Sequence, residues 1–427
     1  MNKTTRNENL WEDAIEGIKK KAEDGKPLSK CNIDTTKKRT RPFDGLVVVP
    51  SQLHKNLPVD VYQEPLETSV IIGENLEKPL LLKTPIFVHA DSYGEISRSA
   101  RNALVYGGSL AGTAVFVSDC FALEEEKEIS SKHGGKIVIE YSASRAGINA
   151  ETLAEADAVE IKLSGGAKPG TSGILPAKKI TPTIAKIRNI SIGHDAFSPA
   201  KHLDMDIPED IKKHIELIRE ITDYETPVIV KIGGGDVYND TKHAINAGAD
   251  AVHIDCSECF VESLPNVAVE NVGVPVLGVF VPAQKAFKET GAKEKGVKLL
   301  ISGEFMDGGD VYKAVALGGD AVGLSTASRI AIGCNACGLC DTNDCEKGIA
   351  TNNANLESKL NWEKAGENLR NFLSATSEEL NILTALSGCN DIRELDAENL
   401  RATTYDVAAI TGIKLIGYDK VLPMWSH

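Results

Sequence analysis

The chain has no surplus of basic residues and no long apolar run. It carries 47 Lys and Arg against 61 Asp and Glu, which gives a formal net charge of −14. Because binding to a phosphate backbone needs a basic footprint, this balance argues against nucleic acid as a partner. No apolar stretch approaches the roughly 18–20 residues that span a bilayer, and residues 1–26 lack the apolar core of a signal peptide. We therefore expect a cytoplasmic protein with no membrane partner.

Cysteine is scarce outside one short segment. The chain has nine Cys in 427 residues, and four of them lie within residues 334–345. A secreted disulfide framework would instead spread an even number of Cys over a shorter chain. Hydrophobic residues make up 42% of the chain, an ordinary balance for a globular protein with a sizeable core. The concentrated cysteines therefore indicate a metal site in a globular protein.

Eight short apolar runs, rich in Val and Ile, follow one another from residue 84 to residue 326. Runs that are apolar on both faces are typical of buried parallel strands. Helical patterns separate the runs, for example at 208–222 and 236–249. Eight strands with crossover helices favour an α/β fold of the (β/α)8 TIM barrel type over an open sheet. The expected strands are 84–90, 112–118, 135–141, 157–163, 226–232, 251–256, 297–303 and 320–326.

The remaining chain divides into three appended parts. Residues 1–42 form an N-terminal extension, in which Trp11, Ile15 and Ile18 have helical spacing. This extension is expected to be a surface helix and linker, or a docking element for a partner subunit. The barrel would occupy 43–332, a cysteine loop 333–352 and a helical C-terminal segment 353–427, with its best amphipathic stretch at 362–386.

The cysteine segment has the spacing C-x2-C-x2-C-x4-C, formed by Cys334, Cys337, Cys340 and Cys345. Thiolates are soft ligands that suit iron–sulfur clusters or zinc. Zinc sites usually use two separated C-x2-C knuckles, whereas a single loop with C-x2-C-x2-C wraps a cuboidal cluster. The spacing therefore favours an iron–sulfur cluster, with zinc and unligated thiols as the alternatives. The loop follows the eighth strand, so a cluster would lie beside whatever binds at that end of the barrel.

Glycine and hydroxyl residues collect where the seventh and eighth strands end. Barrels commonly bind a phosphate at these two loops, on backbone N–H groups and a helix N-terminus. Beside a cluster, such a site suggests FMN, because a flavin and a cluster must be close to exchange electrons. Lys231, at the end of the fifth strand, would place a positive charge near the flavin or form an ion pair inside the barrel. The candidate cofactor residues here are Ser302, Gly303, Gly323, Ser325 and Thr326.

Three stretches of the chain occur in an order and spacing typical of one family. They are Glu160–Lys162 followed by GAKPG at 166–170, Gly309–Val311 running on to Ala327, and Cys334, Cys340 and Cys345 followed by Ala350–Thr351. Through these stretches the chain resembles the FMN-binding synthase domain of glutamate synthase. The resemblance covers roughly residues 84–410, and Ser92–Gly94 echoes it more weakly.

The resemblance implies roles for individual residues. Lys168 and Arg188 fall where the family holds the carboxylates of 2-oxoglutarate, and Lys162 is a further catalytic candidate. Lys231 falls on the flavin lysine, and Ser92 is a further cofactor candidate.

The cluster type depends on one additional cysteine. Cys334, Cys340 and Cys345 match the three ligands of the family's 3Fe–4S cluster, and Cys337 is extra. A fourth thiolate in the same loop favours a 4Fe–4S cluster. If Cys337 points away and packs as a small apolar residue, the family's three-iron cluster remains.

Several departures from the family pattern concern the substrate more than the flavin. Gly165 replaces a Gln, and the glycine-rich loops after the second and sixth strands are replaced by Val117–Phe121 and Cys256–Cys259. No glutaminase region is visible, so ammonia or an amine would come from solution or from a separate subunit.

The function expected from these patterns is that of an oxidoreductase. A ferredoxin-like or flavoprotein donor would supply electrons through the cluster and FMN to an imine, which a 2-oxo acid forms with ammonia or an amine. An oligomer is expected. The alternative is a non-catalytic electron-relay or scaffold subunit.

A few other polar residues have two interpretations each. Cys256 and Cys259 form either a redox pair or structural thiols. His253 shares a strand face with Asp255 and is expected in the barrel core or behind the site, rather than as a base. His202 is a further catalytic candidate, and Glu140 either contacts the flavin or pairs with a barrel Lys.

Overall fold

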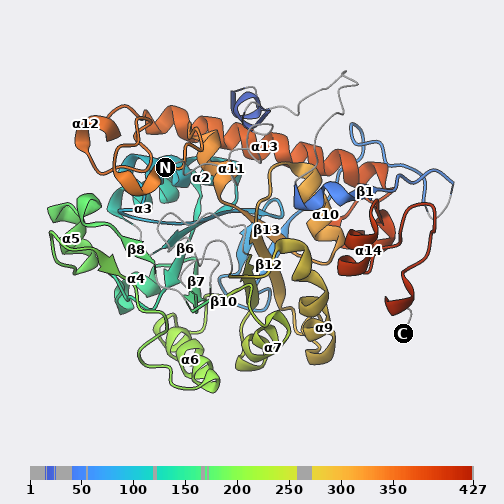
Figure 1. Cartoon of the computed structure of the whole chain (residues 1–427), viewed down its shortest axis with the longest axis horizontal. Helices are drawn as coiled ribbons and strands as arrows, with labels where there is room; N and C mark the ends of the chain where they lie inside the picture. Colours follow the sequence, from blue (N-terminus) through green and yellow to red (C-terminus); the bar gives the residue numbers. More distant parts are fainter. Residues whose placement is uncertain are drawn as a thin grey trace.

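A closed barrel of eight parallel strands forms the centre of the molecule (Figure 1). The computed structural model describes residues 15, 17–23, 25, 41–53, 56–118, 123–164, 169–170, 173–256 and 272–425. Every barrel strand overlaps one of the eight expected runs, so the predicted TIM barrel is confirmed. In order around the barrel, the strands are β4 (Ile86–Ser92), β5 (Ala114–Ser118), β6 (Lys136–Tyr141), β7 (Ala158–Lys162), β10 (Val228–Gly233), β11 (Ala251–Asp255), β12 (Lys298–Gly303) and β13 (Ala321–Leu324).

The barrel strands are buried on both faces, but their interior face is partly polar. All six residues of β10 are buried, as are all five of β11. The register places Lys231 on β10 beside Lys162 on β7 and beside His253 on β11. Alternate residues of a strand share one face, so this register collects charged side chains at one level inside the barrel.

Helices surround the barrel, and the longest one packs along the outside (Figure 1). Helix α13 (Trp362–Leu386) lies against α2 (Arg98–Ala111) and α10 (Gly308–Ala316), and its bounds match the predicted amphipathic stretch. A Cβ at Gly107 would lie 2.7 Å from the carbonyl oxygen of Gly366, so glycine permits the close approach of α2 and α13. The other helices are α3 (Glu124–His133), α4 (Ala150–Ala154), α5 (Pro182–Arg188), α6 (Ile211–Ile221), α7 (Val237–Ala247), α9 (Phe280–Thr290), α11 (Thr326–Ala331), α12 (Ala354–Glu357) and α14 (Tyr405–Thr411).

The appended segments are integrated with the barrel. In the described part of the N-terminal extension, residues 17–23 are helical, Ile18 and Ala22 are buried, and Lys21 Nζ lies 3.2 Å from Glu379 on α13. The C-terminal segment is helical in α12, α13 and α14, as expected, but it also contains a strand. Short strand pairs are β1 (Leu46–Val48) with β14 (Leu400–Ala402), β2 (Val70–Ile72) with β3 (Leu80–Leu82), and β8 (Ile174–Leu175) with β9 (Ala196–Phe197).

None of the helices within the described ranges combines the length and the apolar character that a bilayer crossing requires.

Candidate active site

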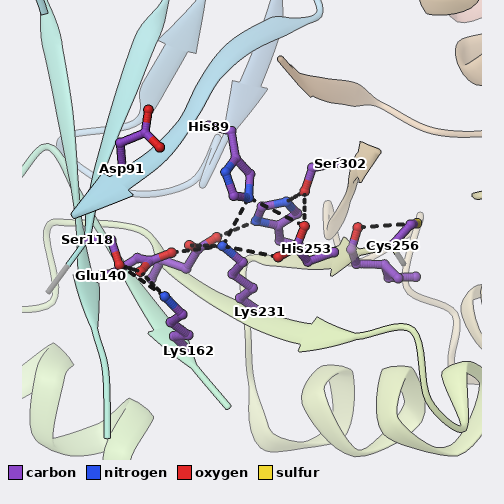
Figure 2. A network of polar contacts seen from close by, with 12 residues as sticks. His89, Asp91, Ser118, Glu140, Lys162, Lys231, His253, Cys256 and Ser302 are labelled. Atoms are coloured by element: carbon purple, nitrogen blue, oxygen red, sulfur yellow. Dashed lines mark hydrogen bonds and ion pairs between the residues drawn. The ribbon is translucent and has the colours of Figure 1, made fainter. Parts of the chain in front are cut away.

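A network of charged side chains fills the barrel interior beneath the strand ends (Figure 2). Lys231 is its centre, with 1% of its side chain exposed. Its Nζ donates to Glu140 Oε1 at 2.8 Å and lies 3.2 Å from His89 Nε2. The predicted interior ion pair of Lys231 is therefore present, and Glu140 is the carboxylate that it binds.

Glu140 also binds a second lysine. Lys162 Nζ donates to Glu140 Oε2 at 2.9 Å and to Ser118 Oγ at 3.0 Å, and Ser118 itself bonds to Glu140. Burial alone would raise the pKa of Glu140, but the Lys162 and Lys231 ammonium groups outweigh it and hold that pKa well below its usual range. Glu140 is therefore a buried carboxylate with two cations, and Lys162 stands at the end of β7 facing it.

The other half of the network joins β7, β11 and β12. His253 Nδ1 lies 2.5 Å from Glu160 Oε1, and His253 Nε2 lies 2.5 Å from Ser302 Oγ. The Ser302 hydroxyl donates to Asp255 Oδ1 at 2.9 Å. His253, Glu160, Asp255 and Ser302 are each 0% exposed. His253 therefore lies in the barrel core, as expected.

Burial and neighbouring charges shift the pKa values of these interior groups in different directions. It raises the pKa of Glu160 to about 8, although Lys231 opposes the shift, and it lowers the pKa of His253 to about 3, with help from Lys231. For Asp255, the nearby Lys231 and His89 outweigh burial and depress the pKa. At neutral pH the interior thus holds a protonated Glu160, a neutral His253 and an ionised Asp255.

Arg188 lies beside the end of β4. It ends α5, is 7% exposed, and its Nη1 donates to the Tyr93 carbonyl oxygen at 3.4 Å, directly after Ser92. Ser92 is the last residue of β4 and pairs in register with Ser118. Arg188 is thus brought to the same end of the barrel as Lys162 and Ser92. Lys168 lies outside the described residues.

The loop that carries His202 is anchored to the same end of the barrel. His202 Nε2 lies 2.7 Å from the Lys162 carbonyl oxygen, which can only accept, so Nε2 carries the proton. Its Nδ1 then accepts from Arg145, which also binds Asp204 at 2.9 Å. Burial lowers the pKa of His202 to about 4, in agreement with a neutral ring. This geometry makes His202 a fixed support for the backbone at Lys162.

The region predicted to bind a phosphate has two parts, which differ in whether side chains already cap the helix amides. Gly303 is the last residue of β12, Gly323 is the penultimate residue of β13 and in register with Ser302, and α11 begins two residues after β13 ends. Ser325 occupies the N-cap position of α11 without making a side-chain cap, and Thr326 is the first helical residue. The amide groups that begin α11 are therefore not capped by the Ser325 side chain.

The N-terminus of α10, in contrast, is already occupied by carboxylates. Asp307 accepts from the amides of Gly309 and Asp310, and Glu379 of α13 accepts from the Gly308 amide at 2.9 Å. Arg41 pairs with both Asp307 and Asp310 at 3.0 Å. The helix opened by Gly308 therefore serves the packing of α10 on α13, and only the ends of β12 and β13 keep the geometry expected for a phosphate.

The four clustered cysteines lie on the loop that follows α11. Cys334, Cys340 and Cys345 are partly buried, whereas Cys337 is exposed. No three of these sulfur atoms lie within 4.8 Å of one another. In a tetrahedral zinc site, Zn–S bonds of about 2.3 Å place the sulfurs only about 3.8 Å apart. As they stand, the sulfur atoms do not have the spacing of a closed tetrahedral zinc site.

Polar contacts join the cysteine loop to the catalytic end of the barrel. Lys179 Nζ donates to the carbonyl oxygens of Glu95 at 2.5 Å and Cys340 at 2.8 Å. The Asn352 amide donates to the carbonyl oxygens of Gly94 at 2.7 Å and Lys179 at 2.8 Å. The loop, the α5 segment with Arg188 and the turn after Ser92 thus form one connected unit.

Comparison with known proteins places the chain in a family. A model described as the conserved region in glutamate synthase matches residues 22–390. The chain belongs to the glutamate synthase family.

Two relatives and one solved structure are similar over most of their length. A glutamate synthase large subunit-like protein of Rhizobium meliloti is 35% identical over 399 residues, which cover 90% of this chain and 89% of the relative. An archaeal glutamate synthase (NADPH) of Archaeoglobus fulgidus is 32% identical, over 92% of this chain and 80% of the relative. A crystal structure of an (S)-mandelate dehydrogenase chimera has a TM-score of 0.56 at 15% identity, with 91% of this chain and 99% of that chain covered, so it shows the shared barrel fold alone.

Sequence inspection missed the hydrogen-bonded set of Glu160, His253 and Ser302. The available signal was alternation, because polar residues two apart on β7 and on β11 share the interior face. Cys256, directly after β11, is fully buried, and Cys259 lies outside the described residues.

Proposed function

We propose that the chain is an oxidoreductase of the glutamate synthase type that uses FMN and an iron–sulfur cluster. Its substrate would be an imine formed from a dicarboxylic 2-oxo acid such as 2-oxoglutarate and ammonia or an amine. The main support is the joining of three elements by Lys179 and Asn352, namely the cysteine loop, the Arg188 segment and the end of β4. Electron transfer requires that a cluster and a flavin lie close together, and these contacts bring their candidate sites together.

The residues present fit an FMN at the strand ends. Ser325 leaves the beginning of α11 without a side-chain cap, next to the ends of β12 and β13, which suits an anionic phosphate. Ser92 supplies a donor at the end of β4, the strand next to β13, and Lys231 supplies one in the barrel interior. When bound there, FMN supplies hydride chemistry that the protein's own side chains lack.

The protein's side chains would bind and orient the substrate. Arg188 offers a guanidinium that holds a carboxylate bidentately, and Lys168 would bind the second carboxylate. Lys162, held by Glu140 and supported through its carbonyl by His202, keeps a cation at the barrel mouth. Fixed donors of this kind orient an imine and help to exclude water, which would hydrolyse it.

The cysteine loop would hold the cluster and receive electrons. Cys334, Cys340 and Cys345 are its partly buried ligands, and the exposed Cys337 would complete a four-iron cluster. A ferredoxin-like or flavoprotein donor would bind on this side. Ammonia would come from solution or from a separate glutaminase or amine-transferring subunit.

Anaerobic reoxidation tests this function. Protein is photoreduced and then mixed with 2-oxoglutarate, with ammonium or methylamine, or with both. The oxidised flavin spectrum should return rapidly only with both components, and Arg188→Ala should slow this return. If flavin-loaded protein stays reduced with every mixture, the electron-relay alternative replaces the enzyme.

A further inference from the structure

The barrel interior contains an unbroken chain of hydrogen bonds that substrate binding does not use. It runs from Glu160 through His253 and Ser302 to Asp255, with heavy-atom distances of 2.5, 2.5 and 2.9 Å. Each of the four residues is 0% exposed. Figure 2 shows His253 and Ser302 facing each other beside Lys231. Short bonds between buried titratable groups are the geometry through which protons move.

The chemistry of the partners fixes the direction of each bond. Asp255 is ionised and can only accept, so the Ser302 hydroxyl donates to it. Ser302 Oγ then accepts from His253 Nε2–H, which leaves His253 Nδ1 as an acceptor. Glu160 must therefore be protonated and donate to Nδ1, in agreement with the raised pKa of its buried carboxyl.

Lys231 lies about equally far from the two ends of the chain, while burial and the neighbouring charges place the resting proton on Glu160. Lys231 Nζ lies 3.8 Å from Glu160 Oε2 and 3.7 Å from Asp255 Oδ2. These two oxygens have no hydrogen-bond partner among the described residues. At one end of the chain, the negative charge of Glu140, which pairs with Lys231 and Lys162, disfavours a second negative charge on Glu160. At the other end, His89 Nε2 lies 3.4 Å from Asp255 Oδ1. A negative charge can thus move between Asp255 and Glu160 while remaining equally close to Lys231.

The two ends of the chain lie at different depths. Asp255 is the last residue of β11, at the catalytic end, whereas Glu160 lies two residues before the end of β7. We propose that Glu160, His253 and Ser302 form a proton relay that stores a proton on Glu160 inside the barrel and delivers it to Asp255 at the catalytic end.

The transfer balances without any further reactant. The Glu160 proton passes to His253 Nδ1, the Nε2 proton passes to Ser302 Oγ, and the Ser302 proton passes to Asp255. Glu160 ends as a carboxylate, Asp255 as a carboxylic acid, and His253 as the opposite neutral tautomer. This role rests on the proposed function, since reduction of an imine consumes a proton at nitrogen together with a hydride at carbon.

A pH jump followed by infrared spectroscopy tests the relay in purified protein, with or without flavin. At about pH 7 the spectrum should contain a protonated carboxylic acid band that Glu160→Gln removes. After a jump to about pH 9, wild type should lose this band quickly, because the relay leads the proton outward. Ser302→Ala breaks the relay and should slow the loss by roughly tenfold or more. Ser109→Ala removes another buried hydroxyl, on α2 and outside the barrel network, and should leave the rate unchanged.

A second measurement follows the tautomer of His253 in the wild-type protein. Nitrogen NMR of ¹⁵N-histidine-labelled wild type should show His253 as the Nε2–H tautomer at about pH 7 and as the Nδ1–H tautomer above the Glu160 pKa of about 8. In Glu160→Gln the Nε2–H tautomer should persist at both pH values, and this difference assigns the signal.

Three results would overturn the relay. They are the absence of the Glu160 band at pH 7, an Nδ1–H tautomer of His253 at pH 7, and equal rates of band loss in wild type and folded Ser302→Ala. Because neither measurement requires flavin, failure of the relay leaves the flavin assignment standing, and failure to bind FMN leaves the relay standing.

Discussion

The barrel interior and the cysteine loop are built in opposite ways. Interior charged groups on β6, β7, β10 and β11 hold one another, with Lys231 bonded to Glu140 and within 4 Å of Glu160 and Asp255. The cysteine loop carries four thiols within residues 334–345, among them Cys334, whose Sγ accepts a 3.3 Å bond from the Ala336 amide. The interior charges are therefore paired largely with one another, whereas the loop holds the candidate ligands of the proposed cluster.

This contrast assigns different tasks to the two regions. The interior fixes charges and protons before any substrate arrives, so its residues should affect stability as well as catalysis. The loop is attached at its edges, through Lys179 and Asn352, and its cysteines should affect cofactor content far more than the fold.

Substitution of Lys231 should destabilise the barrel interior more than any other change considered. Lys231→Met leaves Glu140 with Lys162 alone and leaves Asp255 without its lysine, so the free energy of unfolding should fall by about 3–5 kcal/mol. Urea unfolding measures this loss. Lys136→Met, which removes a partly exposed pair with Asp157, is the matched control and should change little. Equal losses in both variants would contradict a preformed interior.

The cysteines should affect cofactors with little effect on the fold. Cys334→Ser should lose the cluster, whereas Cys337→Ser should convert a four-iron cluster into a three-iron one, because only the exposed ligand is removed. Electron paramagnetic resonance distinguishes the two, since a three-iron cluster is paramagnetic when oxidised and an ordinary low-potential four-iron cluster when reduced. A full oxidised three-iron signal in wild type, unchanged in Cys337→Ser, would rule out the four-iron cluster.

Arg188 belongs to neither region and, as a proposed carboxylate site, should affect substrate binding alone. Arg188→Ala should weaken binding of 2-oxoglutarate by about 1.5–3 kcal/mol, the value of a hydrogen bond to a charged group. Titration calorimetry measures the affinity, and flavin content should stay constant. Lys168→Ala should behave in the same way, while Arg219→Ala, which removes a pair with Asp250 on the outer side, is the control. Unchanged affinity in both Arg188→Ala and Lys168→Ala would refute the carboxylate sites.

The most gradual effect, about 1 kcal/mol for each pH unit, concerns the pH dependence of stability. The folded pKa of Glu160, about 8, lies above its ordinary value of 4.5, so the native state binds more protons than the unfolded state between these values. Stability should therefore fall as pH rises through this window, and Glu160→Gln should remove that part of the slope. The advantage of Glu160→Gln over wild type should grow by on the order of 1 kcal/mol for each pH unit from about pH 5 to pH 8. A constant difference across this range would mean that Glu160 is ionised in the native state.

The parts of the fold that could be predicted are those whose pattern lies within one continuous stretch of sequence. The strand around Val228–Gly233 is a continuous apolar run, and α13 shows its own helical period, so both are visible locally. The pairing of β1 with β14 joins residues more than 350 positions apart, and no local pattern reports it.

The candidate site likewise has a part that could be predicted from the sequence and a part that could not. The cysteine spacing and the family stretches identified the loop, Lys162 and Arg188. Which carboxylate is protonated and which is paired could not be predicted, because Glu160 and His253 meet across 93 positions and only the closed barrel sets their distance from Lys231. Alternation showed that these residues share a face, but burial and geometry decide their charge.

The most direct test of the account is the cofactor content of anaerobically purified protein. FMN released by acid, iron, and acid-labile sulfide are measured per chain, together with the visible spectrum before and after reduction. The account predicts stoichiometric FMN and a cluster in the same chain, with Cys334→Ser losing the iron. Folded, iron-replete protein that neither carries FMN nor takes it up would contradict it.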